Sequence, residues 1–228
     1  MTEIWHGITR AIDLIISLDP EVVEVAGRSL LISLTSTLLA SLICLPVASA
    51  IHFNRFPGKR LLVSLIQTFF SIPTVVIGLI VFTLFSRTGP LGGLNLLFTP
   101  TIMVVGQALL ITPILLGLTI SALSGVDQAV LDTARSLGAS GLQTAVVVLR
   151  EARFAVIAAV IMGFSRAISE IGIALMVGGN IRGFTRVITT AISLESSRGD
   201  VELSIALGII LILIALLVNI TLNRLQQR

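Results

Sequence analysis

Long apolar runs that are almost free of charged residues constrain this chain more than any other feature. They cover residues 29–51, 61–85, 101–124, 154–179 and 203–222, and only the fourth contains charged side chains, Arg166 and Glu170. A helix of about 20 apolar residues spans the hydrocarbon core of a bilayer. Because 55% of the residues are hydrophobic and only 12% are charged, a water-soluble fold is excluded. The sequence therefore predicts an all-α membrane protein with five transmembrane helices.

The first 19 residues mix polar and apolar side chains at helical spacing. Isoleucines and Trp5 share one face, whereas Glu3, Arg10 and Asp13 lie elsewhere. This pattern is typical of an amphipathic helix that lies along the bilayer surface, with the indole as an interfacial anchor. We therefore expect an interfacial helix over residues 1–19 and a membrane domain over residues 20–228.

Five spans place the two termini on opposite sides of the membrane. With the polar loop between the third and fourth spans inside, the inner segments carry eight basic residues and the outer segments carry six; Arg166, within a span, completes the fifteen. Basic residues favour the cytoplasmic side. We expect a multi-pass protein of the cytoplasmic (inner) membrane, with its N-terminus outside and its C-terminus in the cytoplasm.

That polar loop, residues 125–153, has the periodicity of ordered structure. Apolar residues at helical spacing end near Leu137, and Gly138 then permits a turn that other residues resist. Ser140 and Gln143 have the spacing of a capping box, which starts a second helix. The loop is predicted to be a helix, a glycine turn and a helix.

The charged pair within the fourth span requires an explanation. An arginine near the bilayer centre costs about 2.5–3.5 kcal/mol on insertion scales, so Arg166 is expected to face a protein interior or a wet cavity. Glu170 lies one helical turn later and can pair with it, and Ser165 and Ser169 add hydroxyl groups nearby. Two interpretations stay open: a polar lining of an anion path, or an internal ion pair that fixes helix packing.

The chain lacks the motifs of common catalytic and metal sites. It has no phosphate-binding P-loop and no zinc-protease or nucleophile-elbow motif, and its single cysteine, Cys44, lies within an apolar run. No basic run is interleaved with aromatic residues, so nucleic acid is not an expected partner. We expect no catalytic residue, no metal site and no cofactor in this chain, so that ATP and magnesium, if used, bind a separate subunit.

The polar loop resembles a known motif. Asp132-Thr133-Ala134, followed by Gly138, is similar to the EAA loop of ABC-importer permeases, although Asp-Thr replaces the usual Glu-Ala and no proline ends the loop. In that family the loop is cytoplasmic and docks into a groove on the ATPase. The resemblance implies ATPase-coupling residues at Asp132, Ala134, Arg135, Leu137, Gly138 and Ala139.

Further stretches resemble the molybdate and tungstate permeases of this family, which have the type I ABC-importer permease fold. These stretches are residues 71–79, 89–92 and 165–172, and residues 176–186 and 189–195 are most similar to tungstate permeases. The resemblance implies a homodimer, two ATP-binding subunits, and an extracytoplasmic binding protein that delivers tungstate. From the residues themselves we expect a translocation path at Ser165, Arg166, Ser169 and Glu170 and an outer gate at Gly178, Gly179, Asn180, Arg182 and Arg186.

Three alternatives stay open. The substrate can be molybdate or another oxyanion, because tungstate and molybdate share their charge and nearly their size. A different class is an ion-coupled secondary carrier in which Glu170 is the coupling carboxylate. A third is a membrane anchor or assembly factor without transport.

For residues 178–180, a simple helix stop is the alternative to a flexible outer mouth.

Overall fold

The computed structural model describes residues 2–226, and all its regular elements are helical. Met1 and residues 227–228, at the two ends of the expected regions 1–19 and 20–228, lie outside this description. The helices are α1 Thr2–Ile16, α2 Pro20–Phe53, α3 Lys59–Thr68, η1 Phe69–Ser71, α4 Thr74–Phe85, η2 Gly92–Leu94, α5 Pro100–Ser124, α6 Gln128–Ser136, α7 Gly141–Glu151, α8 Arg153–Ile168, η3 Ala174–Gly178, α9 Ile188–Arg198 and α10 Val201–Gln226.

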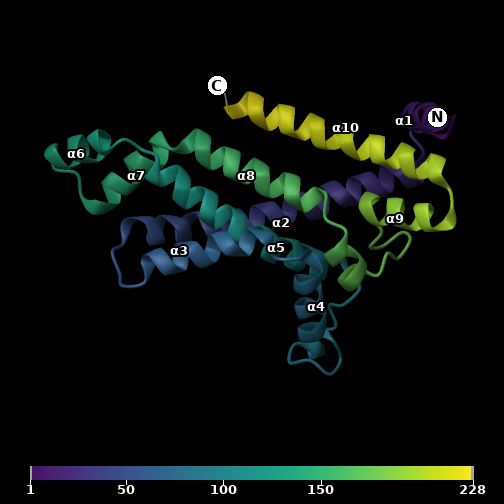
Figure 1. Ribbon diagram of the computed structural model, residues 1–228, viewed down its shortest axis with the longest axis horizontal. Coiled ribbons are helices and arrows are strands. Elements are labelled where there is room, and N and C mark those ends of the chain that lie inside the picture. Colours follow the sequence, from purple (N-terminus) through teal and green to yellow (C-terminus); the bar gives the residue numbers. More distant parts are fainter. Residues whose placement is uncertain (1, 227–228) are drawn as a thin grey trace.

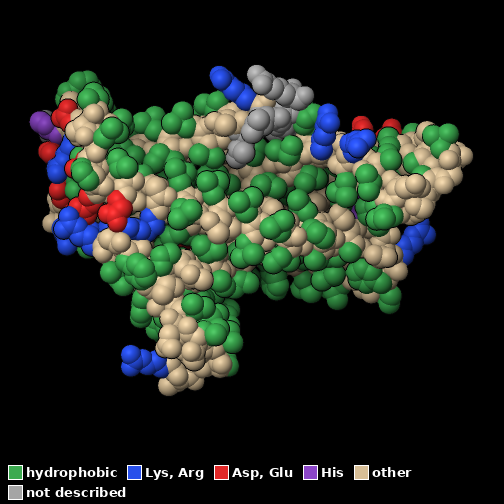
Figure 2. Space-filling model, turned by 180° about the vertical axis from the view of Figure 1, so that it is seen from behind, with side chains coloured by type: hydrophobic (Ala, Val, Ile, Leu, Met, Phe, Trp, Pro, Cys, Tyr) green, Lys and Arg blue, Asp and Glu red, His purple; other side chains and the backbone are tan. Residues whose placement is uncertain are grey.

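Four helices, α2, α5, α8 and α10, run along the long axis of the molecule (Figure 1). The α6–α7 pair lies at one end of this axis, and α1 and α9 lie at the other. Charged side chains gather toward these two ends, and a broad hydrophobic band separates them (Figure 2). The band is what a chain surrounded by lipid requires, since lipid tails are as apolar as leucine side chains.

Local signals start the long helices where the sequence provides them. The Asp19 carboxylate accepts a hydrogen bond from the Val22 amide at 3.0 Å, and Pro20 occupies the first turn of α2. Thr99 and Pro100 start α5 in the same way. The helix α5 continues through Pro113 and packs mainly against α2 and α8.

Five continuous spans are not confirmed. Among the described helices, α2, α5 and α10 are long and apolar enough to cross a membrane, and the bent pair of α3 and α4 adds a fourth span if it counts as one. The expected span 61–85 bends by 98° next to Pro73. Proline lacks an amide proton and disfavours helix at the residue before it, which explains the break.

The expected span 154–179 is also broken. Its helix α8 ends at Ile168, and a π-helical segment, Ala174–Gly178, follows after a short irregular stretch. The break occurs because the Glu170 carboxylate accepts the Ile173 amide at 3.0 Å and starts a new segment. An apolar run therefore determines burial here, whereas a single carboxylate decides where the helix stops.

The helix α1 packs along α10 by its small residues. A Cβ atom on Gly7 would lie 2.6 Å from the Ile205 side chain, and Ala11 is buried. Trp5, Ile12 and Ile16 stay exposed on the remaining surface. The helix over residues 2–16 is therefore present, while its position along the bilayer surface stays a prediction.

Candidate functional site: a coupling arm, a broken-helix centre and an outer charge cluster

The polar loop folds as the sequence predicts, and we call residues 127–151 the coupling arm. Asp127 caps α6 through the Ala129 amide at 2.9 Å. Ser140 and Gln143 form the reciprocal capping box that starts α7, with bonds of 2.8 and 3.3 Å. Gly138 has φ +78° between the two helices, a conformation that favours glycine. Local interactions thus fix the start of each helix and the turn between them.

The coupling arm presents uncovered apolar side chains. Leu137 is 83% exposed and Leu142 is 79% exposed. Ala134, three residues before Leu137, is buried. A cavity of about 400 Å³ between α6 and α7 is lined by Ala134, Leu137, Thr133 and Val147 among others. Exposed leucines beside a hollow are typical of a protein-binding surface.

The polar members of the predicted coupling set point outward from the arm. Asp132 and Arg135 are exposed, and Ala139 is half-buried after the glycine turn. Asp132 accepts a hydrogen bond from the Gln128 amide group at 3.1 Å. The structure therefore brings all six predicted coupling residues onto one short arm at one end of the molecule.

Arg166 and Glu170 form the predicted ion pair. The Arg166 Nη1 and Glu170 Oε2 atoms are 3.0 Å apart, and the Glu170 side chain is only 1% exposed against 35% for Arg166. The second oxygen of Glu170 is occupied by the Ile173 amide, and the Glu170 carbonyl accepts the Thr189 hydroxyl at 2.8 Å. Glu170 therefore joins α8, the π-helical segment and α9.

The two serines of this set are engaged within the protein. The Ser165 hydroxyl donates to the Asn219 side chain of α10 at 3.1 Å, and the Ser169 hydroxyl donates to backbone carbonyls of its own helix. Of the four residues predicted for a path, Ser169 is exposed, Ser165 and Arg166 are partly exposed, and Glu170 is buried.

The two broken spans meet at their breaks. A Cβ atom on Gly172 would lie 2.7 Å from the Thr74 hydroxyl oxygen, directly after the Pro73 break. One turn further along α4, a Cβ atom on Gly78 would lie 2.9 Å from the Met176 sulfur. Such close approach needs glycine, so these positions hold two discontinuous helices against each other. Discontinuous helices at a common level are a recurrent feature of substrate sites in transporters.

Thr185 organises the predicted outer gate. Gly179 and Asn180 have φ values of +72° and +51°, so the chain turns sharply after the buried Gly178. The Thr185 hydroxyl donates to the Gly178 carbonyl at 2.6 Å and accepts the Ile181 amide at 2.9 Å. Thr185 is completely buried, and it closes the loop into a compact turn rather than a loose outer mouth.

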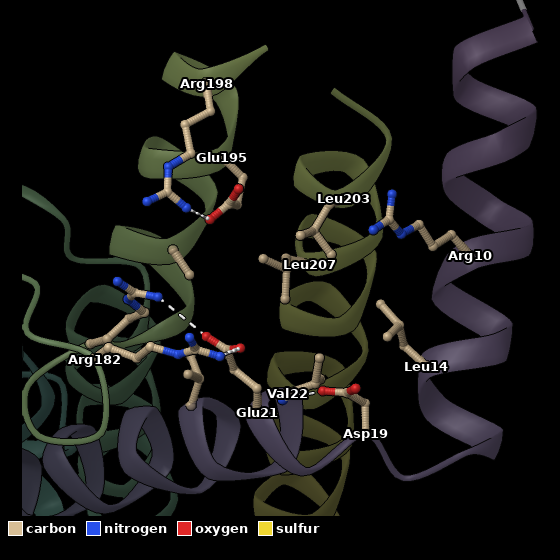
Figure 3. A pocket seen from close by; sticks show the side chains of 13 residues that line it. Arg10, Leu14, Asp19, Glu21, Val22, Arg182, Glu195, Arg198, Leu203 and Leu207 are labelled. Atoms are coloured by element: carbon tan, nitrogen blue, oxygen red, sulfur yellow. Dashed lines mark hydrogen bonds and ion pairs between the residues drawn. The ribbon is translucent and has the colours of Figure 1, made fainter. Parts of the chain in front are cut away.

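The outer arginines converge on one carboxylate. Glu21, in the first turn of α2, pairs with Arg182 at 2.5 Å and with Arg186 at 3.2 Å. Arg182 is 73% exposed, whereas Arg186 is 13% exposed. Figure 3 shows Glu21 and Arg182 beside a cavity of about 370 Å³ that α1, α9, α10 and the start of α2 enclose, and Arg186 also lines this cavity. We call Glu21, Arg182 and Arg186 the outer charge cluster.

Glu21 carries no signal in the sequence, because more than 150 residues separate it from its partners. Thr185 and Asn219 were missed for a similar reason, since a hydroxyl or an amide in an apolar context gives no signal until its partner is known. At the start of α9, Val187, Ile188 and Ala191 are buried. Within the described residues, no group of three or more His, Cys, Asp or Glu residues is placed to hold a metal ion.

The comparisons with known proteins agree with this arrangement. A family model described as the binding-protein-dependent transport system inner membrane component matches residues 38–228. The chain is 39% identical over 227 residues to the tungstate uptake system permease protein of Peptoclostridium acidaminophilum, and the match covers 100% of both chains. It is 40% identical over 211 residues to the probable anion ABC transporter permease protein of Haloferax volcanii, covering 90% of this chain and 91% of the relative.

Among solved structures, a chain of the inward-facing MetNI methionine ABC transporter has a similar fold. The TM-score is 0.74 at 17% sequence identity, and the match covers 92% of this chain and 97% of that chain. At this level of identity the similarity concerns the fold alone.

Proposed function

Because the chain belongs to the family of binding-protein-dependent transport system inner membrane components, we propose that it is the membrane-spanning subunit of an ABC importer for tungstate. The observation that carries the proposal is the coupling arm, which exposes two leucines beside a cavity at one end of the helix bundle. The chain is also similar in sequence to a tungstate permease over its full length. Energy for transport comes from ATP hydrolysis on a separate subunit.

The coupling arm is the part that docks on the ATPase. Leu137 and Leu142 supply apolar area that an ATPase groove can bury, and each contributes about 1.5–3 kcal/mol when fully buried. Asp132 and Arg135 supply charges that select the partner and its orientation. Gly138 and Ala139 set the angle between α6 and α7, so that a movement of the ATPase is passed to α8.

The translocation path passes the meeting point of the two broken helices. The guanidinium of Arg166, whose side chain is about one-third exposed, attracts an oxyanion, and its pairing with Glu170 prevents the anion from binding too tightly to leave. The outer charge cluster, with Arg182 exposed, forms the approach to this path. Tight selection of the substrate belongs to an extracytoplasmic binding protein.

The assembly contains a second copy of this chain, two ATP-binding subunits and that binding protein. A second copy is supported by α4, which stands away from the bundle in Figure 1 and exposes Val75, Leu79 and Ile80. We place the α6–α7 end in the cytoplasm, and with it the C-terminus, while α1 and α9 lie on the outer side of the inner membrane.

Molybdate or another oxyanion is the alternative substrate, because the two relatives differ in this respect: one is named for tungstate and the other for an anion in general.

The carrier alternative requires Glu170 to bind and release a cation. Its burial and its two internal partners, Arg166 and the Ile173 amide, argue against that role.

Metal accumulation in cells tests the substrate. Cells lacking this chain are given tungstate and molybdate at equal low concentrations, and both metals are measured. Loss of tungsten uptake with unchanged molybdenum is expected. Loss of molybdenum alone, or of neither metal, would rule out tungstate as the substrate.

Reconstitution tests the energy source. In proteoliposomes that contain the permease and its ATPase, with the binding protein added, tungstate uptake is expected to require ATP and to stop with vanadate. Uptake by the permease alone, driven by an ion gradient, would support the carrier instead.

A further inference from the structure

We propose that a basic groove at the α6–α7 end binds the headgroup of an anionic phospholipid. The groove has a volume of about 670 Å³ and lies between the α2–α3 connection, α3 and the end of α5. Its charges come from Arg55, Lys59 and Arg60, and its walls include Val63 and Ile120. This inference concerns the lipid around the protein and does not depend on which substrate is transported.

The charges of the groove are largely unused within the protein. No aspartate or glutamate lines it. The Lys59 ammonium donates to the carbonyls of His52 and Asn54, at 2.5 and 3.2 Å, and so closes the end of α2. Within the part of the chain that the structure describes, the exposed guanidinium groups of Arg55 and Arg60 make no hydrogen bond or ion pair. Two free guanidinium forks and one fixed ammonium match a phosphate diester.

The cavity beside the outer charge cluster provides the contrast. It is lined by four arginines, and each has a carboxylate partner: Arg10 pairs with Asp200, Arg198 with Glu195, and both Arg182 and Arg186 with Glu21. An anion that entered there would have to displace these carboxylates. The basic groove has no such competitor, so it is the better anion site of the two.

The walls of the groove indicate a lipid rather than a free anion. Phe56, Val63 and Ile120 form the apolar part of its lining, and the Phe56 side chain is 39% exposed. Phosphate alone gains nothing from such a wall, whereas acyl chains can cover it. A basic pocket between helix ends, next to apolar surface, is a known mode of lipid recognition.

Native mass spectrometry of the purified permease with its ATPase subunits tests the proposal. The complex is titrated with dioleoyl phosphatidylglycerol, dioleoyl phosphatidylcholine and inorganic phosphate. The test variant is Arg55→Gln with Arg60→Gln. The matched control, Arg87→Gln with Arg224→Gln, removes two exposed arginines that lie outside both the groove and the coupling arm.

Each basic residue near an anionic headgroup contributes about 1 kcal/mol, so the double test variant is expected to bind phosphatidylglycerol roughly thirtyfold more weakly. The control is expected to stay within about threefold of the unchanged protein, and phosphatidylcholine is expected to bind all forms weakly. If the double variant does not assemble, the single change Arg60→Gln is expected to weaken binding roughly fivefold.

Three results would overturn the proposal. Equal loss in the test and control variants would mean that only the overall charge matters. Displacement of phosphatidylglycerol by an equal concentration of inorganic phosphate would mean a free-anion site. Release of the ATPase subunits from the Arg55/Arg60 variant, with lipid binding unchanged, would mean that the groove contacts protein.

Discussion

A single carboxylate, Glu170, determines how the centre of the molecule is built. One carboxylate oxygen forms an ion pair with Arg166, and the other accepts a hydrogen bond from the Ile173 amide. The backbone carbonyl of Glu170 accepts a hydrogen bond from the Thr189 hydroxyl. Leaving one of these partners unpaired in a buried site costs about 1–3 kcal/mol. The ion pair itself contributes less than its geometry suggests, since Arg166 is one-third exposed and water screens it.

The two functions of Glu170 can be separated by mutation. Glu170→Gln keeps an oxygen that accepts the Ile173 amide and loses only the charge, so we expect a modest loss of thermal stability. Glu170→Ala also leaves the Ile173 amide unsatisfied, and we expect a further loss of about 1–3 kcal/mol. The measurement is thermal unfolding of the purified complex.

Arg198→Gln is the control for this series, because the Arg198–Glu195 pair is exposed on its arginine side and should contribute less than about 1 kcal/mol. Equal stability of the Gln and Ala variants at position 170 would contradict the capping function.

Thr185 offers a second test at the scale of one residue. Thr185→Val keeps the shape and removes the hydroxyl, so the Gly178 carbonyl and the Ile181 amide both lose a buried partner. We expect faster hydrogen exchange over residues 178–186, at least tenfold at Ile181, as measured by mass spectrometry. Thr185→Ser retains the hydroxyl and is expected to exchange like the unchanged protein; if it matches the valine variant, packing of the methyl group explains the effect instead.

At the scale of elements, the coupling arm is the most local structure in the chain. Its caps, its glycine turn and its two helices are encoded within about 25 residues, which is why the sequence predicts them correctly. The broken spans are the opposite case. Their breaks lie at Pro73 and Glu170, far apart in the sequence. Only the contact between Gly172 and Thr74 explains why the two breaks lie next to each other in the folded chain.

Two glycines of the coupling arm form a matched pair for mutation. At both Gly138 and Gly141 an added Cβ atom would meet no other atom within 4 Å, but only Gly138 has a positive φ. Gly138→Ala should therefore cost about 1–2 kcal/mol of backbone strain, whereas Gly141→Ala, at the start of α7, should be neutral or slightly stabilising.

The predicted consequence is weaker coupling in the Gly138 variant alone. Tungstate-dependent ATPase activity of the reconstituted complex is the measurement, with hydrogen exchange of residues 128–151 as the structural readout. An equal loss in both variants would show that the turn conformation is not what transmits the movement.

At the scale of the whole molecule, the two charged ends are separated by the hydrophobic band (Figure 2), which leads to a prediction of orientation. In a Cys44→Ala background, which removes the single cysteine, Ser197→Cys on α9 and Ser136→Cys on α6 each introduce one exposed thiol. An impermeant maleimide is expected to label Ser197→Cys in intact cells and Ser136→Cys only after permeabilisation. Labelling of Ser136→Cys from outside would reverse the orientation.

The sequence by itself determined the membrane class, the helical content, the coupling arm and the Arg166–Glu170 pair. All of these rest on composition or on residues within a few helical turns of one another. Apolar runs must be buried in lipid or protein, and caps and i,i+4 pairs act over distances that the chain itself fixes.

Only the tertiary structure decided the number of continuous spans, the partner of the outer arginines and the closure of the loop around Thr185. Each depends on groups that folding brings together from distant positions, such as Glu21 with Arg182 and Arg186. The hydropathy of a segment indicates how much of its surface must be buried. Where a buried polar group ends one helix or connects two helices depends on the position of its hydrogen-bond partner. That partner is a property of the folded chain and not of the local sequence.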